Sequence, residues 1–271
     1  EYKFLRRALA DDHQLMLTGL VRIADKERKF TFRGSGEEDT NPLFQGFDKQ
    51  DEATERYDEA VFIRLDTETA DELRRGFPAT AEQLFQFDAV ILDDVERASL
   101  TRDQLDLLER FVAQRGGGLL MLGGAESFAH GGYQHTSIAR MLPVYLDESP
   151  DAPVGRVRMA ITREGWLQPW VRLRATEDDE RVRLANMPGF ITFNRLRGIK
   201  PGASILAEVK DEQNTTWPAL VAQRYGRGRA AALTVGDLWR WRLKQLDDDN
   251  DTPIDEDERD RHGERQRQRA K

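Results

Sequence analysis

The chain has 271 residues, 39% of them hydrophobic, which is enough for one large domain or two small ones with an apolar core. No apolar stretch approaches the roughly 20 residues that cross a bilayer, so we expect no membrane span and no direct membrane contact from this segment. The formal charge of −8 without a basic cluster disfavours nucleic acid, and the absence of cysteine excludes disulfides, thiolate metal sites and thiolate nucleophiles.

The N-terminal part predicts a helix, a strand and a charged loop. Apolar residues between Tyr2 and Leu9 share one helical face, and the apolar run from Leu15 to Ile23 is typical of a strand. A doubly wound sheet normally places a strand before such a helix, so we expect that strand to precede Glu1 in a longer polypeptide. Charge dominates from Asp25 to Glu59, which predicts the least ordered internal segment.

The centre of the chain predicts a strand, a helix and a second strand. The runs Asp88 to Val95 and Leu119 to Leu122 have the near-continuous apolar character of strands buried in a parallel sheet. Between them, Thr101 and Gln104 form a capping-box pattern, which starts an amphipathic helix that Gly116 ends. This βαβ unit places the chain in the α/β class.

Short helices are predicted on both sides of this unit, and a β-rich part follows. A second capping-box pattern from Thr80 to Gln83 starts one helix, and residues 136–142 form another, which Pro143 ends. From about residue 151 the pattern changes to short β-like runs, at residues 157–161, 171–173, 204–209, 219–223 and 230–235. We therefore expect one α/β domain over residues 1–243 with a late β-meander, and a solvated charged tail over residues 244–271.

Polar and glycine residues follow both central strands. In open α/β sheets ligands bind outside the carboxyl ends of the strands, so these residues form the candidate ligand cleft. Its members are Asp93, Asp94, Gly123, Gly124, Ala125, Glu126, Ser127, His130 and Tyr133.

Stretches spread over most of residues 1–243 share the pattern of one known superfamily. They are residues 1–9, 87–94, 116–128, 131–133, 200–203, 225–229 and 239–241. Together they resemble the class I glutamine amidotransferase-like superfamily, and more narrowly the amidotransferase-like domain of large bacterial membrane-associated proteins that often carry von Willebrand A-type domains. The resemblance implies a flavodoxin-like three-layer α/β/α fold with a mainly parallel sheet and late β-meander additions.

Active members of that superfamily carry Gly-x-Cys-x-Gly at a strand-to-helix elbow, which exposes the thiol and points backbone N–H groups at the oxyanion. The matching window here runs from Gly123 to Ser127. Ala125 stands at the cysteine position, and Ser127 replaces the second glycine. We therefore expect no glutamine hydrolysis by the class I mechanism, which needs a thiolate.

Three other chemistries are conceivable for the polar and aromatic residues of this chain. A nucleophilic Ser127 would need His130 or His135 as its base, but the spacing is not Gly-x-Ser-x-Gly, and a loop residue is the simpler interpretation. The two histidines with Glu126 and the Asp93-Asp94 pair offer hard ligands without a known metal motif, so we expect no metal. The five tryptophans could form a carbohydrate platform, although core packing is their commoner use.

The sequence predicts a non-catalytic glutamine amidotransferase-like domain that binds protein partners or a small polar ligand, without a cofactor, inside a larger envelope-associated bacterial protein. The alternative is a hydrolase or amidotransferase-type enzyme that uses a non-cysteine nucleophile, with Ser127, Glu126 or a histidine in that role.

Overall fold

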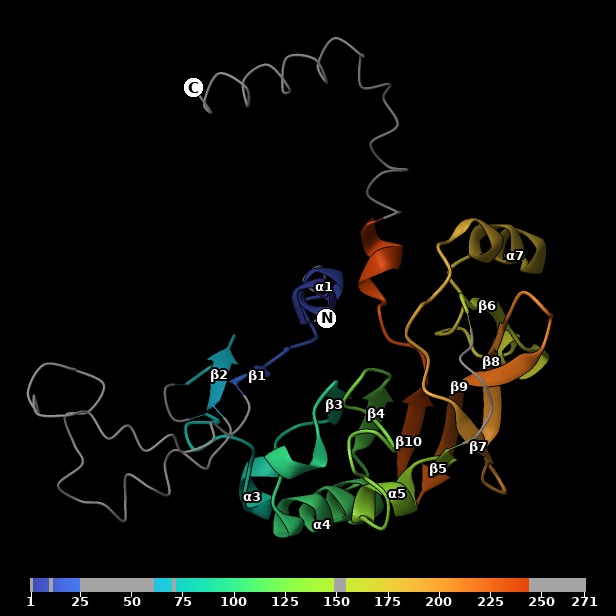
Figure 1. Cartoon of the computed structure of the whole chain (residues 1–271). Helices are drawn as coiled ribbons and strands as arrows, with labels where there is room; N and C mark the ends of the chain where they lie inside the picture. The colour runs from blue at the N-terminus through green and yellow to red at the C-terminus, as the bar shows by residue number, and fades with distance from the viewer. Residues whose placement is uncertain (1, 10–11, 25–60, 70–71, 149–154, 244–271) are drawn as a thin grey trace, which may run out of the picture.

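The computed structural model describes residues 2–9, 12–24, 61–69, 72–148 and 155–243 (Figure 1). The predicted least ordered segment, Asp25 to Glu59, and the charged tail over residues 244–271 lie outside the described residues. In chain order the elements are α1 (Tyr2–Leu9), β1 (Gly19–Ala24), β2 (Val61–Leu65), α3 (Ala81–Leu84), β3 (Ala89–Asp93), η2 (Arg97–Ser99), α4 (Arg102–Arg110), η3 (Phe111–Arg115), β4 (Gly118–Leu122), α5 (Ser137–Met141), β5 (Val144–Glu148), β6 (Arg158–Ile161), α6 (Arg163–Trp166), α7 (Glu177–Asn186), β7 (Leu196–Ile199), β8 (Ser204–Lys210), β9 (Thr216–Tyr225) and β10 (Gly228–Leu233).

The protein is of the α/β class, with a six-stranded mixed sheet in the order β3-β4-β10-β9-β8-β6. β3, β4 and β10 are parallel to one another, whereas the pairings of β10 with β9, β9 with β8 and β8 with β6 are antiparallel. A two-residue turn at Gly226, whose φ is 58°, joins β9 to β10 and imposes the antiparallel pairing. The expected mainly parallel sheet is therefore limited to three of the described strands.

The predicted central βαβ unit is confirmed. β3 and β4 are adjacent and parallel, with Leu92 opposite Met121. Thr101 and Gln104 make both hydrogen bonds of the capping box at the start of α4, and Gly116, with φ 94°, ends the π-helical turn η3 that continues it.

The main core lies between the helices α4 and α5 and one face of the sheet (Figure 1). Its buried members include Leu105, Leu108 and Phe111 from the helical side and Leu119 and Met121 from β4. On the opposite face of β3, Ile91 is 37% exposed, and no residue of α1 is buried. The described residues thus do not show a packed second helical layer, which the three-layer expectation requires.

The strand predicted at Leu15 to Ile23 forms, as β1, but not in the central sheet. β1 pairs with β2 in a separate antiparallel ribbon. The Tyr2 hydroxyl donates to Asp66 at 2.7 Å, and Arg6 forms an ion pair with the same carboxylate, so α1 is fastened to the end of this ribbon.

The β-rich half contains the expected meander, formed by β8, β9 and β10, together with elements that the sequence did not predict. The helix α7 begins at Thr176, whose hydroxyl accepts from the N–H of Asp179, and four acidic residues fill its first turn, where the helix dipole favours negative charge. Residues 171–173 were expected to form a strand, but they are an irregular segment with no strand partner among the described residues. Trp239 and Trp241 lie in a helical turn near the end of the described residues.

Candidate functional site

The candidate site is the elbow where β4 ends. Gly123 lies against the next strand so closely that a Cβ atom there would stand 2.6 Å from the carbonyl oxygen of Thr234. Only glycine fits this approach, because real Cβ contacts are longer than about 3 Å. The chain therefore leaves the sheet in a turn that is fixed by backbone packing.

Asn194 fixes the next residue of the elbow. Its side chain is buried, its Oδ1 accepts from the N–H of Gly124 at 2.9 Å, and its Nδ2 donates to the carbonyl oxygen of Gly124 at 2.9 Å. A side-chain amide can satisfy both polar groups of one peptide residue in this way. Asn194 is not among the predicted site residues, because it lies 70 residues from Gly124 and no local pattern marks it.

Asp94, which directly follows the neighbouring strand β3, contacts the elbow. Its backbone is left-handed, with φ 49°, and its Oδ1 accepts a hydrogen bond of 2.7 Å from the N–H of Glu126. A Cβ atom on Gly124 would stand 2.2 Å from the same oxygen, so the carboxylate lies directly against the turn. The N–H group that follows Ala125 is thus already bound to a carboxylate of the protein itself.

The side chains of the elbow loop differ sharply in exposure. Ala125 and Glu126 are exposed, whereas Ser127 is only 1% exposed. His130 and His135 are both exposed. The structure therefore places the only hydroxyl of the window inside the protein and the two candidate bases on its surface.

The remaining members of the predicted cleft are structural neighbours of the elbow. Tyr133 is buried and donates its hydroxyl to the carbonyl oxygen of Val95 at 2.7 Å, and burial, with nearby Glu96, raises the pKa of Tyr133. Burial also raises the pKa of Asp93, and the charge of the adjacent Asp94 acts in the same direction. Through its hydrogen bond to Val95, Tyr133 holds the elbow loop to the segment that directly follows β3.

The described residues contain neither a candidate metal cluster nor a candidate membrane-spanning helix. No three histidine, aspartate or glutamate side chains in that part of the chain are grouped as ligands for a metal ion. No helix there is long and apolar enough for a bilayer crossing.

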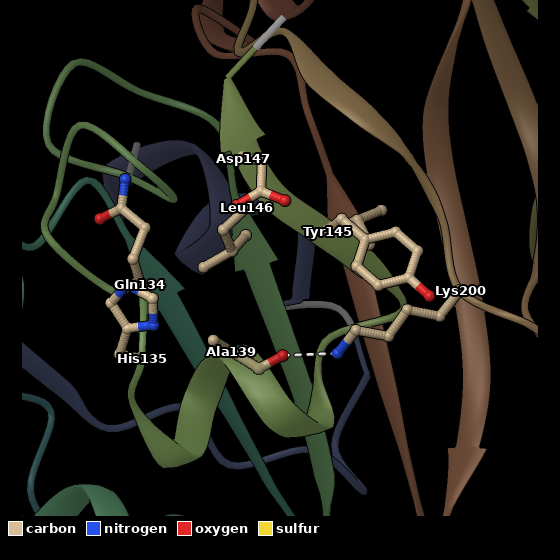
Figure 2. Close-up of a pocket in the computed structure, with 8 residues that line it drawn as sticks. Gln134, His135, Ala139, Tyr145, Leu146, Asp147 and Lys200 are labelled. Carbon is tan, nitrogen blue, oxygen red and sulfur yellow. Dashed lines mark hydrogen bonds between the residues drawn. The ribbon is translucent and has the colours of Figure 1, made fainter.

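A hollow of about 120 Å³ lies beside α5 and β5 (Figure 2), and none of the elbow residues Gly123 to Ser127 lines it. Lys200 reaches into its wall and donates from Nζ to the carbonyl oxygens of Ala139, at 2.5 Å, and Arg140, at 3.0 Å. The ammonium thus caps the carboxyl end of α5, where a cation is favourable, and burial lowers the pKa of Lys200. His135 also lines this hollow, so it belongs here and not to the elbow.

An elbow after a parallel strand of an α/β domain agrees with the resemblance to glutamine amidotransferase-like proteins seen in the sequence. The family described as "Putative glutamine amidotransferase" matches residues 47–248, and the chain belongs to that family. No relative was found among curated protein sequences.

Solved structures with partial likeness are known. The cytoplasmic protein STM3548 from Salmonella typhimurium is 19% identical, over 65% of this chain and 79% of that one, with a TM-score of 0.45. The cytoplasmic protein STM1381 from Salmonella typhimurium LT2 is 24% identical, over 69% and 84% of the two chains, with a TM-score of 0.43. The exo-beta-1,4-mannosidase Op5Man5 from Opitutaceae bacterium strain TAV5 is 18% identical, over 60% and 23%, with a TM-score of 0.36.

Proposed function

We propose that this chain is a non-catalytic member of the glutamine amidotransferase-like family, which binds protein partners or a small polar ligand. We further propose that residues 1–243 are one divergent flavodoxin-like domain of a larger, membrane-associated bacterial protein that carries von Willebrand A-type domains. The support for a non-catalytic role comes from the elbow, whereas the parent protein is inferred from the sequence resemblance alone.

One observation carries the proposal: the Asp94 carboxylate accepts the N–H of Glu126 at 2.7 Å. At a nucleophile elbow, the N–H of the residue after the nucleophile stabilises the oxyanion. Glu126 is that residue, because Ala125 stands at the nucleophile position. The negative charge of Asp94 thus lies where the negative charge of an oxyanion would develop during the reaction. This disfavours a tetrahedral intermediate at the elbow.

The burial of Ser127 supports the same proposal over the enzyme alternative. A serine nucleophile must be reached by the substrate and by a base within hydrogen-bond distance. Ser127 is 1% exposed, while His130 lies on the surface. The two side chains thus lie in different environments, one buried and one exposed, which disfavours their acting as a nucleophile and its base.

Ammonia release from glutamine by the purified chain tests the proposal. We expect release at the buffer background for the wild type and for Ser127→Ala. Ser137→Ala is the matched control, since Ser137 is a second buried serine, held by Asp106 away from the elbow. Turnover that disappears in Ser127→Ala but survives in Ser137→Ala would refute the proposal and support the enzyme.

A further inference from the structure

The two edges of the six-stranded sheet differ in how they are covered. Val157, which directly precedes the edge strand β6, exchanges backbone hydrogen bonds of 2.9 and 2.8 Å with Phe190. Arg158 of β6 donates to the carbonyl oxygens of Ala185 and Met187 at the end of α7. At the other end of the sheet, β3 pairs with β4 alone among the described strands (Figure 1). The fold therefore covers one edge of the sheet and leaves the other open.

The open edge of β3 has none of the features that protect edge strands. Proteins commonly block such edges with proline, lysine or a β-bulge, because the unpaired N–H and C=O groups are a template for another strand. β3 has the sequence Ala-Val-Ile-Leu-Asp, and its register with β4 is continuous from Ala89 to Asp93. The central residue of β3, Ile91, is 37% exposed. The strand thus offers an apolar edge for pairing.

Two arginines stand on the same face of the sheet as Ile91. Arg229 on β10 lies directly opposite Arg224 on β9, and both side chains are exposed. Like charges in this position are destabilising, so the pair is costly unless negative charge approaches it. Arg229, Gly118 and Ala89 lie side by side in one row across β10, β4 and β3. No long side chain therefore separates Arg229 from the open edge within this row.

The amino end of β3 is positively charged. Asp88 forms an ion pair with Arg115 at 2.7 Å. On the helical side, Glu82 and Arg110 attract each other and add one charge of each sign. Three arginines of the β9–β10 hairpin remain without an acidic partner among the described residues: Arg224, Arg227 and Arg229.

The carboxyl end of β3 is negatively charged. Four carboxylates lie at the last residue of the strand, in the segment that follows it and in the elbow loop: Asp93, Asp94, Glu96 and Glu126. Two arginines oppose them, Arg97 and Arg22, of which Arg22 forms an ion pair with Glu96 at 3.0 Å. The carboxylates are in excess, so the two ends of the open edge are complementary in charge to each other.

We propose that β3 pairs antiparallel with β3 of a second copy of this chain, across a twofold axis at Ile91. A twofold interface requires a surface that is complementary to itself, and this edge has an apolar centre between ends of opposite charge. The pairing places Ile91 opposite Ile91 of the second copy and Ala89 opposite Asp93. Each basic end then lies beside an acidic end, whereas a parallel pairing would bring like charges together. This inference concerns assembly and does not depend on whether the elbow is catalytic.

Sedimentation equilibrium of the full chain tests this proposal. We expect a dimer whose dissociation constant rises about tenfold in Ile91→Lys, because the change removes an apolar pair and sets two like charges opposite each other. Ile191→Lys is the matched control, since Ile191 is 57% exposed and lies outside the sheet, and it should dimerise like the wild type. Arg229→Glu should also weaken the dimer and reduce its dependence on salt.

Disulfide trapping is a second test, which the absence of cysteine from the chain makes specific. In an antiparallel pair, residues directly opposite each other have Cα atoms about 4.5–5.5 Å apart, within the range that a disulfide spans. Mild oxidation should therefore give a covalent dimer from Ile91→Cys and none from Ile191→Cys. The cysteine variant keeps a small apolar side chain, so this test does not depend on the folding of Ile91→Lys.

Three outcomes would overturn the proposal. The first is a wild-type chain that stays monomeric at every concentration reached. The second is a dimer that neither Ile91→Lys nor Arg229→Glu weakens, since another surface would then join the copies. The third is equal cross-linking of Ile91→Cys and Ile191→Cys, which would indicate random collision.

Discussion

The parallel and antiparallel parts of the sheet are built in different ways. In the parallel part, β3, α4 and β4 follow one another in the chain and give the core Leu92, Leu108 and Met121 among others, while later segments complete it with residues such as Ile138 and Leu196. In the antiparallel part, the core joins Val157, Phe190 and Trp241 from distant segments. There the rings of Phe190 and Trp241 lie 4.9 Å apart, and Trp241 donates to the carbonyl oxygen of Pro188.

This difference explains where the elbow lies and how it is held. Gly124 belongs to the parallel part, whereas Asn194, which binds both of its backbone polar groups, comes from the antiparallel part. The site is therefore a product of both parts, and the following variants test each part and then their connection.

The largest expected effect is in the parallel core. Leu108→Ala should destabilise the protein by about 2–5 kcal/mol, because Leu108 is fully buried and its truncation leaves a cavity. Val182→Ala on α7 is the control, with an expected change within about 0.5 kcal/mol, because Val182 is 61% exposed. Urea unfolding measures both. A change below about 0.5 kcal/mol for Leu108→Ala would mean that the buried face of α4 was misassigned.

In the antiparallel part, Glu180→Gln should cost about 1–3 kcal/mol, since it leaves the guanidinium of Arg183 without its carboxylate. Burial alone would raise the pKa of Glu180, but Arg183 and the N–H groups of Leu173 and Arg174 outweigh burial and lower it. The stabilisation is thus present above the ordinary glutamate pKa and is lost as the pH falls through the folded-state value. Acid unfolding should be less steep in Glu180→Gln, and equal slopes would refute this assignment.

The connection between the parts is tested by Asn194→Ala. Removal of the amide leaves the N–H and carbonyl groups of Gly124 without their partner, at a cost of about 1–2 kcal/mol. Asn186→Ala, at the exposed end of α7, should be nearly neutral. Thermal unfolding compares the melting temperatures of Asn194→Ala and Asn186→Ala. Equal melting temperatures would show that the stability of the elbow does not depend on Asn194.

The fold could be predicted from the sequence where contacts are local. The apolar runs of β3 and β4 and the cap of α4 each act within a few residues, and both predictions are confirmed. α7 was missed because its apolar pattern is weak, although the cap at Thr176 and the acidic first turn both mark the start of a helix. β5 pairs with β7 across some fifty residues, and such a partner leaves no local signal.

For the candidate site, the sequence predicted the position of the elbow and the loss of its nucleophile, but not its internal geometry. The Asp94 carboxylate binds the N–H of Glu126, which lies 32 residues further along the chain. The direction of the Asp94 side chain depends on its left-handed backbone conformation, which the sequence at the end of a strand does not predict. Whether Ser127 faces inward also depends on the packing of Phe128, which is buried with φ 54°. These features arise from the tertiary structure.

The smallest expected effect compares two threonines that share one sequence pattern. Thr101 accepts from the N–H of Gln104 at 3.2 Å, and Gln104 returns a bond to the N–H of Thr101 at 2.9 Å. Thr80 stands at the same position before α3, but its side chain makes no capping hydrogen bond, and Gln83 accepts instead from the N–H of Ala79. The capping-box prediction was thus right for α4 and wrong for the side chain of Thr80.

The two alanine variants should therefore separate. Thr101→Ala should lower the free energy of unfolding by about 1 kcal/mol, because it removes an N-cap acceptor, while Thr80→Ala should change it by less than about 0.5 kcal/mol. Urea unfolding under identical conditions compares them directly. Equal losses would mean that Thr80 also caps its helix in solution, and that the short α3, whose only buried side chain is Leu84, depends on that cap as much as α4 does.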